Sequence, residues 1–115
     1  MRTQHMNSLL HQHTESIVSA AIHAVLPDVA VVRALQGYHF GTGKIVLVAA
    51  GKAAWQMANA ASDCLGDRIA DGVVVTKYGH IKGPSAHIRC FEGGHPVPDD
   101  GSCRGTLAAL DLVQG

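Results

Sequence analysis

Residues 45–58 read Ile45-Val46-Leu47-Val48-Ala49-Ala50-Gly51-Lys52-Ala53-Ala54-Trp55-Gln56-Met57-Ala58, and this stretch decides the fold. The first six residues are apolar without alternation, which predicts a strand that is covered on both faces. The alanine-rich residues 53–61 favour a helix directly after it. Gly51 and Lys52 therefore lie between the carboxyl end of a strand and the start of a helix. Unpaired N–H groups and the helix dipole favour an anion at such a place.

The known phosphate motifs do not fit this stretch. A G-x-x-x-x-G-K-[ST] loop would need a glycine at Val46 and a hydroxyl residue at Ala53. A dinucleotide fingerprint is absent as well, and Gly41-Thr42-Gly43-Lys44 precedes the strand instead of following it. The residues alone thus leave two equal alternatives for Lys52, a phosphate ligand or a solvated lysine at a helix start.

Composition limits the classes of protein to which the chain can belong. Its 115 residues are 47% hydrophobic, which suits one small globular domain with a core. Nine basic and nine acidic residues cancel, and aromatic residues make up only 4%, which argues against a nucleic-acid partner. No apolar run is long enough to predict a membrane span, and the polar N-terminus is unlike a signal peptide. We therefore expect a cytoplasmic protein.

The three cysteines agree with this location. Cys64, Cys90 and Cys103 are odd in number, widely spaced and without a C-x-x-C pair, so we expect reduced, buried thiols that carry no chemistry.

The N-terminal part of the chain predicts helices. Apolar residues recur at helical spacing from Leu9 to Val25, and Pro27 ends that pattern. Asp28 is expected to cap a second short helix that ends near Gly37. Residues 1–40 are thus predicted to form a helical lead-in.

Residues 45–115 are predicted to form a βαβ core. The helix after Lys52 ends at Gly66, and residues 67–72 connect it to a strand at residues 73–76. An irregular loop at residues 77–87 leads to a strand at residues 88–92, and a helix follows Asp99. Connections of this length favour a mostly parallel sheet in an α/β fold.

Three loops follow the carboxyl ends of the three predicted strands. They are Gly51-Lys52, residues 77–80 and residues 93–99. Parallel strands bring such loops to one edge of the sheet, where α/β proteins bind ligands. We expect the candidate site at this edge.

Three motifs together carry a resemblance to a known family. They are Gly51-Lys52-Ala53-Ala54 with Met57-Ala58, then Val75-Thr76-Lys77-Tyr78-Gly79-His80, then Glu92-Gly93-Gly94-His95-Pro96-Val97-Pro98-Asp99. In this order and spacing they resemble the N-terminal domain of glycerate 2-kinases of the MOFRL type, from about Ile17 to the C-terminus. The resemblance implies a partial Rossmann-like layered fold, and residues 1–115 as one incomplete domain, the N-terminal fragment of a larger two-domain enzyme.

The resemblance also implies an activity. Such an enzyme transfers the γ-phosphoryl group of ATP, with Mg²⁺, to the 2-hydroxyl of D-glycerate and forms 2-phosphoglycerate. Lys52 would be the catalytic lysine near the transferred phosphate. Substrate or phosphate would be bound by residues from all three loops, namely Gly51, Lys77, Tyr78, His80, Gly94 and His95. For the loop residues, ligand binding and a purely structural role stay open as alternatives.

Metal binding by the protein itself is not expected. His11 and His13 are two residues apart and point to different faces of a helix, so we interpret them as solvated. H-E-x-x-H and zinc spacings are absent. The expected Mg²⁺ would be held largely by phosphate oxygens and water.

Two other hypotheses remain beside the kinase. A hydroxypyruvate reductase is a name that this family often carries, but it needs a dinucleotide fingerprint after a strand, and Ala50-Gly51-Lys52-Ala53 is not one. The second is a non-catalytic remnant. Under the kinase hypothesis, the missing C-terminal portion of the same enzyme completes the site, and residues 1–115 alone are expected to be inactive.

Overall fold

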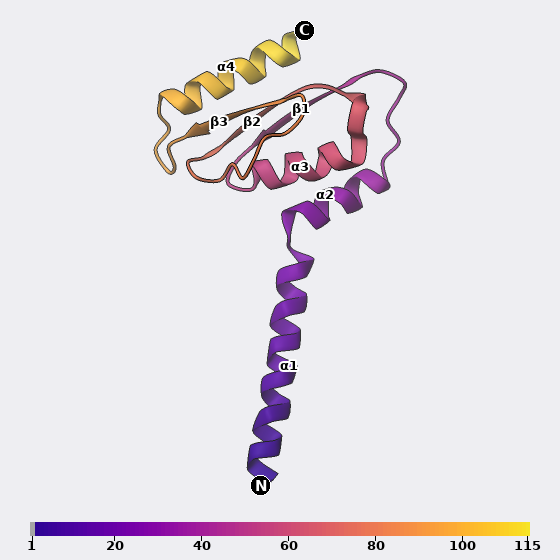
Figure 1. Cartoon of the computed structure of the whole chain (residues 1–115), viewed down its shortest axis with the longest axis vertical. Coiled ribbons are helices and arrows are strands. Elements are labelled where there is room, and N and C mark those ends of the chain that lie inside the picture. Colours follow the sequence, from indigo (N-terminus) through magenta and orange to yellow (C-terminus); the bar gives the residue numbers. More distant parts are fainter. Residues whose placement is uncertain (1) are drawn as a thin grey trace.

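The computed structural model describes residues 2–115 as an α/β fold around a three-stranded parallel sheet in the order β1-β2-β3. Helix α3 covers one face of the sheet and α4 covers the other, so the core has three layers (Figure 1). The strands are β1 (Ile45–Ala50), β2 (Ile69–Lys77) and β3 (Ile88–Gly93). The α/β class and the parallel sheet predicted from the sequence are confirmed.

Strand β2 is the middle strand and is longer than predicted. It begins at Ile69, after a 3₁₀ turn at Gly66–Arg68, whereas the sequence predicted a connection as far as Gly72. Asp71 and Gly72 are turn residues by propensity, yet they pair with Val46 and Leu47 of β1. Pairing within the sheet overrides local turn preference here.

Strand β1 has the predicted bounds but not the predicted coverage. Its residues alternate between half-buried and exposed, and Val46 and Val48 are 46% and 45% exposed. The prediction of a strand covered on both faces is therefore wrong for this chain. Helix α4 lies mainly over β2 and β3, so it leaves one face of β1 open.

The two N-terminal helices are α1 (Arg2–Ala24) and α2 (Pro27–Gln36). Pro27 ends the first helix as predicted, but it also takes the first position of the second. The residue at the N-cap is consequently Leu26, and Asp28 lies in the first turn. The expected capping role of Asp28 is wrong.

Helix α3 (Ala54–Leu65) supplies small residues to the core. Ala54 and Ala58 are buried against Val74 and Ile88. Trp55 packs at the edge of this cluster, whereas Met57 is 41% exposed. Gly66 ends the helix with φ of 54°, as the sequence predicted.

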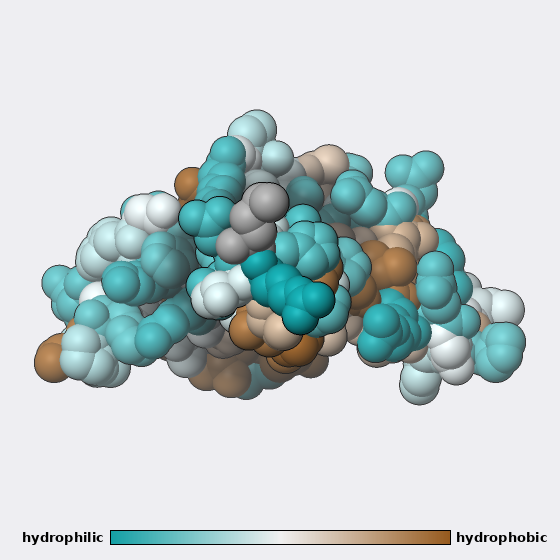
Figure 2. Space-filling view, turned by 90° about the horizontal axis from the view of Figure 1, so that it is seen from below, coloured by the Kyte–Doolittle hydropathy of each residue, from teal (hydrophilic) through white to brown (hydrophobic). Residues whose placement is uncertain are grey.

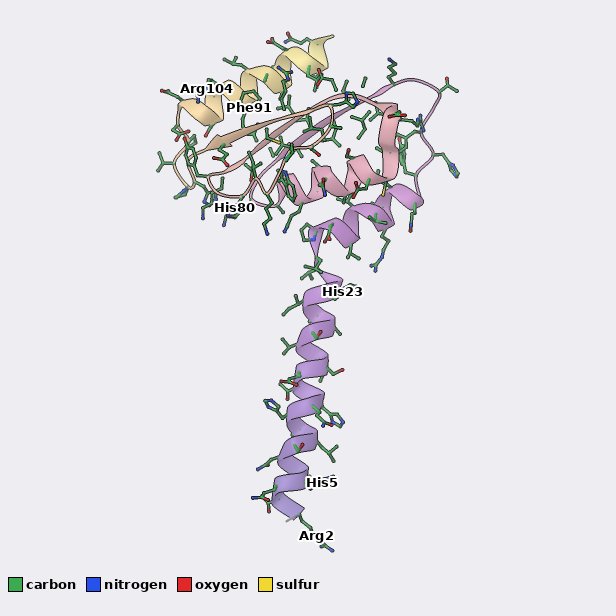
Figure 3. All side chains as sticks on the ribbon, in the orientation of Figure 1. Arg2, His5, His23, His80, Phe91 and Arg104 are labelled. Atoms are coloured by element: carbon green, nitrogen blue, oxygen red, sulfur yellow. The ribbon has the colours of Figure 1, made fainter. Side chains whose placement is uncertain are left out.

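Helix α4 (Asp100–Gln114) packs closely on the sheet because two of its residues lack side chains. Gly101 and Gly105 are both buried. A Cβ atom at Gly105 would lie 2.6 Å from Cγ2 of Val75 and 3.0 Å from Cβ of Phe91, which lies between α4 and the sheet (Figure 3). These glycines cost helix propensity but permit the contact that holds the helix.

Helix α1 gives the molecule its elongated shape. It extends away from the sheet as a rod and has no buried residue (Figure 1). The radius of gyration is 19.2 Å, compared with about 13 to 14 Å for a compact domain of this length. Apolar residues Met6, Leu9, Leu10 and Ile17 are 40% to 70% exposed. Figure 2, which views the molecule from below, shows brown apolar patches among the polar side chains of the surface.

Within residues 2–115, no single helix is both long enough and apolar enough to cross a membrane. Only α1 and α2 taken together meet that test, and they are bent by 56° at their junction.

The three cysteines are free, but two of them are not buried. Cys64 and Cys103 are exposed and Cys90 is half-buried, so the expectation of buried thiols is wrong for Cys64 and Cys103. Burial raises the pKa of the Cys90 thiol.

Replacing Gly105 by alanine should destabilise the protein although alanine is the better helix former. Overpacking a core contact costs about 1–3 kcal/mol, against the roughly 1 kcal/mol that alanine gains in helix propensity. We expect the free energy of unfolding in urea to fall by about 1 kcal/mol, the middle of the difference between these two terms. Gly43→Ala is the matched control, because a Cβ there meets nothing within 4 Å. A Gly105→Ala chain as stable as the control would contradict the packing of α4.

Candidate functional site

The three loops predicted to form a site meet at one edge of the sheet. All three strands run in the same direction, so their carboxyl ends lie at one edge: Lys77 pairs with Gly93, and Ala50 pairs with Val75, two residues before the end of β2. The loop after β2 is the central one. Hydrogen bonds join it to the loop after β1 on one side and to the loop after β3 on the other.

The Gly51-Lys52 turn is held by its backbone carbonyls. The Thr76 hydroxyl donates to the Gly51 carbonyl at 2.9 Å, and Nδ1 of His80 lies 3.0 Å from the Lys52 carbonyl oxygen. Because a carbonyl only accepts, the Nδ1 atom of His80 carries the proton in this bond. Gly51 has φ of 117°, a conformation that favours glycine. The backbone of Lys52 is thus fixed while its side chain stays exposed.

Thr76 supports the candidate site through a contact that the sequence analysis does not predict. The sequence places it at the end of a strand and within the second motif. Its side chain is 4% exposed and is the one buried polar side chain among residues 2–115. A hydroxyl at the buried end of a parallel strand needs a partner, and the adjacent loop supplies the Gly51 carbonyl. The requirement of a buried hydroxyl for a hydrogen-bond partner is therefore the sequence signal that predicts a contact between Thr76 and a neighbouring loop.

Tyr78 and Asp99 join the second and third loops. The Tyr78 hydroxyl donates to Oδ2 of Asp99 at 2.8 Å. Oδ1 of Asp99 accepts from the backbone N–H groups of Gly101 and Ser102, which caps α4. The sequence predicts a helix after Asp99 but not the hydrogen bond from Tyr78. Tyr78, a predicted ligand-binding residue, uses its hydroxyl within the protein.

This hydrogen bond shifts the pKa values of both partners. The bond from Tyr78, followed by the backbone N–H of Gly94, lowers the pKa of Asp99. The bond to Asp99, followed by desolvation, raises the pKa of Tyr78. Asp99 therefore stays ionised and Tyr78 stays protonated across the neutral range.

The remaining predicted site residues lie at the same edge but do not all face one space. Lys77 is the last residue of β2, opposite Gly93 of β3, and is exposed. Gly94 lies close to Val97 and Asp99 within its own loop. His95 is exposed and precedes Pro96 through a cis peptide bond.

A cavity of about 440 Å³ lies beside the Gly51-Lys52 turn. Its lining residues come from the start of α2, the start of α3 and the loop after β2: Pro27, Lys52, Ala53, Gln56, Gly79, His80 and Lys82. Figure 3 shows His80 at this end of the sheet. The lining contains two lysines and no carboxylate, so the cavity suits an anion. Among the predicted site residues, the cavity brings together Lys52 and His80. It leaves out Gly51, Lys77, Tyr78, Gly94 and His95.

A larger cavity of about 560 Å³ lies between α2 and α3. Its lining includes Asp28, Asp63 and Arg33, and none of its residues belongs to the three loops. The two carboxylates in its lining make it a poorer candidate for binding phosphate.

Metal ligands do not gather anywhere in residues 2–115, where no group of three or more His, Cys, Asp or Glu could hold an ion. His11 instead lies 3.1 Å from Glu15 on the exposed surface of α1.

Comparison with known proteins places the chain in a family. Residues 13–115 match the family described as Domain of unknown function (DUF4147). The chain belongs to that family. A D-glycerate 2-kinase of Thermotoga maritima is 48% identical over 97 residues, which are 84% of this chain and 23% of that protein. The resemblance of this chain to glycerate 2-kinases is confirmed.

A solved structure supports the same relation. The crystal structure of a glycerate kinase from Thermotoga maritima matches 92% of this chain and 25% of its own, with 45% identity and a TM-score of 0.86. A putative hydroxypyruvate reductase of Agrobacterium vitis is 43% identical over 72 residues, which are 63% of this chain and 18% of that protein. The family member described here spans about a quarter or less of the length of these relatives.

The hydrogen bond between Tyr78 and Asp99 can be tested by titration. In a Tyr38→Phe chain, Tyr78 is the one remaining tyrosine, and tyrosinate absorbance at 295 nm should report a pKa above 10. Asp99→Asn should lower that pKa toward 10, because the carboxylate charge is lost. Asp100→Asn is the control, since Asp100 is adjacent and exposed. A tyrosine that titrates alike in both variants would rule out the bond.

The shifted pKa values of Tyr78 and Asp99 also predict how the stability of the fold depends on pH. A lowered carboxyl pKa stabilises the fold above the unfolded value of about 4, and this contribution is lost as the pH falls through the lowered pKa. A raised tyrosine pKa stabilises the fold below about 10, and this contribution is lost as the pH rises through the raised pKa. The dependence on pH in both ranges should be weaker in a Tyr78→Phe chain when unfolding is followed in urea.

Proposed function

We propose that this chain is the N-terminal part of an ATP-dependent glycerate 2-kinase, which transfers the γ-phosphoryl group to the 2-hydroxyl of D-glycerate. The observation that carries the proposal is the Gly51-Lys52 turn at the carboxyl end of β1. Thr76 and His80 hold its carbonyls and leave the Lys52 ammonium beside a cavity without carboxylates. The names of the glycerate kinase relatives support the choice of substrate.

Lys52 has a defined task in this reaction. The 2-hydroxyl oxygen forms a bond to the γ-phosphorus while the bond to the β,γ-bridging oxygen breaks, ADP leaves and the hydroxyl proton is released. Negative charge spreads over the phosphoryl oxygens in the transition state. An ammonium group on a fixed backbone stabilises that charge without reorganisation. ATP supplies the phosphoryl group, and Mg²⁺ would neutralise its oxygens.

The large exposed surface of the chain supports the proposal that a missing portion of the same enzyme packs against it. The accessible surface is 8166 Å², whereas a compact monomer of this mass exposes about 6,000 Å². The excess of roughly 2,000 Å² on this one chain is larger than the about 800 Å² that each partner buries in a standard protein interface. It includes the apolar residues of α1 and the open face of β1. We propose that the C-terminal portion covers these faces and completes the site, so that residues 1–115 alone are inactive.

The name of the Agrobacterium vitis relative keeps a reductase acting on hydroxypyruvate as a second candidate. A nicotinamide enzyme needs glycines that let the backbone approach a pyrophosphate after a strand. After β1 this chain has Gly51 followed by Lys52, Ala53, Ala54, Trp55 and Gln56. This sequence favours a phosphate-binding lysine over a dinucleotide turn.

A chimera as long as the glycerate kinase relatives tests the proposal. Residues 1–115 would replace the matching N-terminal quarter of the Thermotoga maritima D-glycerate 2-kinase. We expect this chimera to form 2-phosphoglycerate from D-glycerate and ATP, and Lys52→Ala to lower kcat at least about 100-fold, as for loss of other transition-state contacts. Lys44→Ala should change kcat less than twofold, because Lys44 precedes β1 and lies at the opposite end of that strand.

Two results would contradict the proposal. One is phosphorylation that is unaffected by Lys52→Ala. The other is a chimera that oxidises NADH or NADPH with hydroxypyruvate and does not phosphorylate glycerate. Residues 1–115 assayed alone should show neither reaction.

A further inference from the structure

Lys82 is a second cation at the cavity beside Lys52, and neither the motifs nor the proposed role of Lys52 accounts for it. It lies in the loop between β2 and β3, and its side chain lines the same 440 Å³ cavity. We propose that Lys52 and Lys82 together bind one oxyanion in this cavity, with Lys82 as a binding residue. The identity of the natural oxyanion, a nucleotide phosphate or the glycerate carboxylate, rests on the proposed function. The binding of an oxyanion by the two lysines does not.

The loop that carries Lys82 is anchored on both sides of this residue. On its N-terminal side, His80 is bound to the Lys52 carbonyl and its own N–H donates to the Lys77 carbonyl at 3.1 Å. On its C-terminal side, the indole Nε1 of Trp55 donates to the Gly83 carbonyl at 3.0 Å. These bonds fold the loop across the start of α3, so Lys82 is held near Lys52 despite the irregular sequence of the loop.

The chemistry of the lining selects an anion. Two ammonium groups share the cavity, and the other lining residues are neutral or a histidine, with no carboxylate to compensate the charge. The start of α3 lies at the same place, and its dipole adds to the positive potential. An oxyanion in the cavity would be attracted by both ammonium groups, and the attraction to each increases as the distance falls.

Phosphate binding to the 115-residue chain tests this proposal directly. Inorganic phosphate and D-glycerate are titrated separately at constant ionic strength while backbone amide shifts are followed by NMR. We expect saturable shifts at Ala53, His80 and Lys82. Lys82→Met should weaken binding about fivefold, Lys82→Arg should retain it, and Lys44→Met should leave it unchanged, since Lys44 is exposed at the other end of β1. The tighter of the two probes identifies the source of the oxyanion.

Binding that is unchanged in Lys82→Met, or shifts that do not saturate, would overturn the proposal. The same substitutions in the full-length chimera give a second measurement that does not depend on the isolated chain. There Lys82→Met should raise KM for ATP or D-glycerate about fivefold with a smaller change in kcat, and an unchanged KM for both would overturn the proposal. A chimera that lacks kinase activity but whose chain binds phosphate through both lysines would refute the proposed function and leave this inference standing.

Discussion

Strand β2 is the constraint on which the rest of the structure depends. Val73 and Val74 are fully buried, one facing each side of the sheet, so α3 and α4 are both fixed by this strand. At its carboxyl end, the same strand continues into the groups that hold the neighbouring loops: Thr76 binds the Gly51 carbonyl and Tyr78 binds Asp99. One strand therefore sets both the packing of the layers and the spacing of the loops at the candidate site.

The loop residues around the site divide into groups that hold the backbone and groups that remain available to a ligand. Thr76, Tyr78 and Asp99 use their polar atoms on other parts of the protein. Lys52 and Lys82 have exposed side chains on a fixed backbone. Such a division is expected where a site is preorganised, because the supporting hydrogen bonds are made before a ligand arrives.

Much of this arrangement could be predicted from the sequence, and the failures have physical causes. The elements could be identified from apolar runs and from the terminal Gly66, because these signals are local. The extension of β2 through Asp71 and Gly72 could not be predicted, since it depends on pairing with distant residues. The partners of Thr76 and Tyr78 lie 25 and 21 residues away in sequence. Lys82 was missed because its loop has no periodicity that places its side chains.

The attachment of α1 has a dynamic consequence. This helix of 23 residues rests on the body mainly through its junction with α2 and buries none of its own residues. A rod held at one end reorients on the nanosecond to microsecond timescale, as weakly packed terminal elements do. A polypeptide that covers α1 must restrict this motion, and part of its binding free energy is spent on the lost orientational entropy. The NMR relaxation rates of the backbone amides in α1 would therefore report whether a polypeptide is bound to this helix.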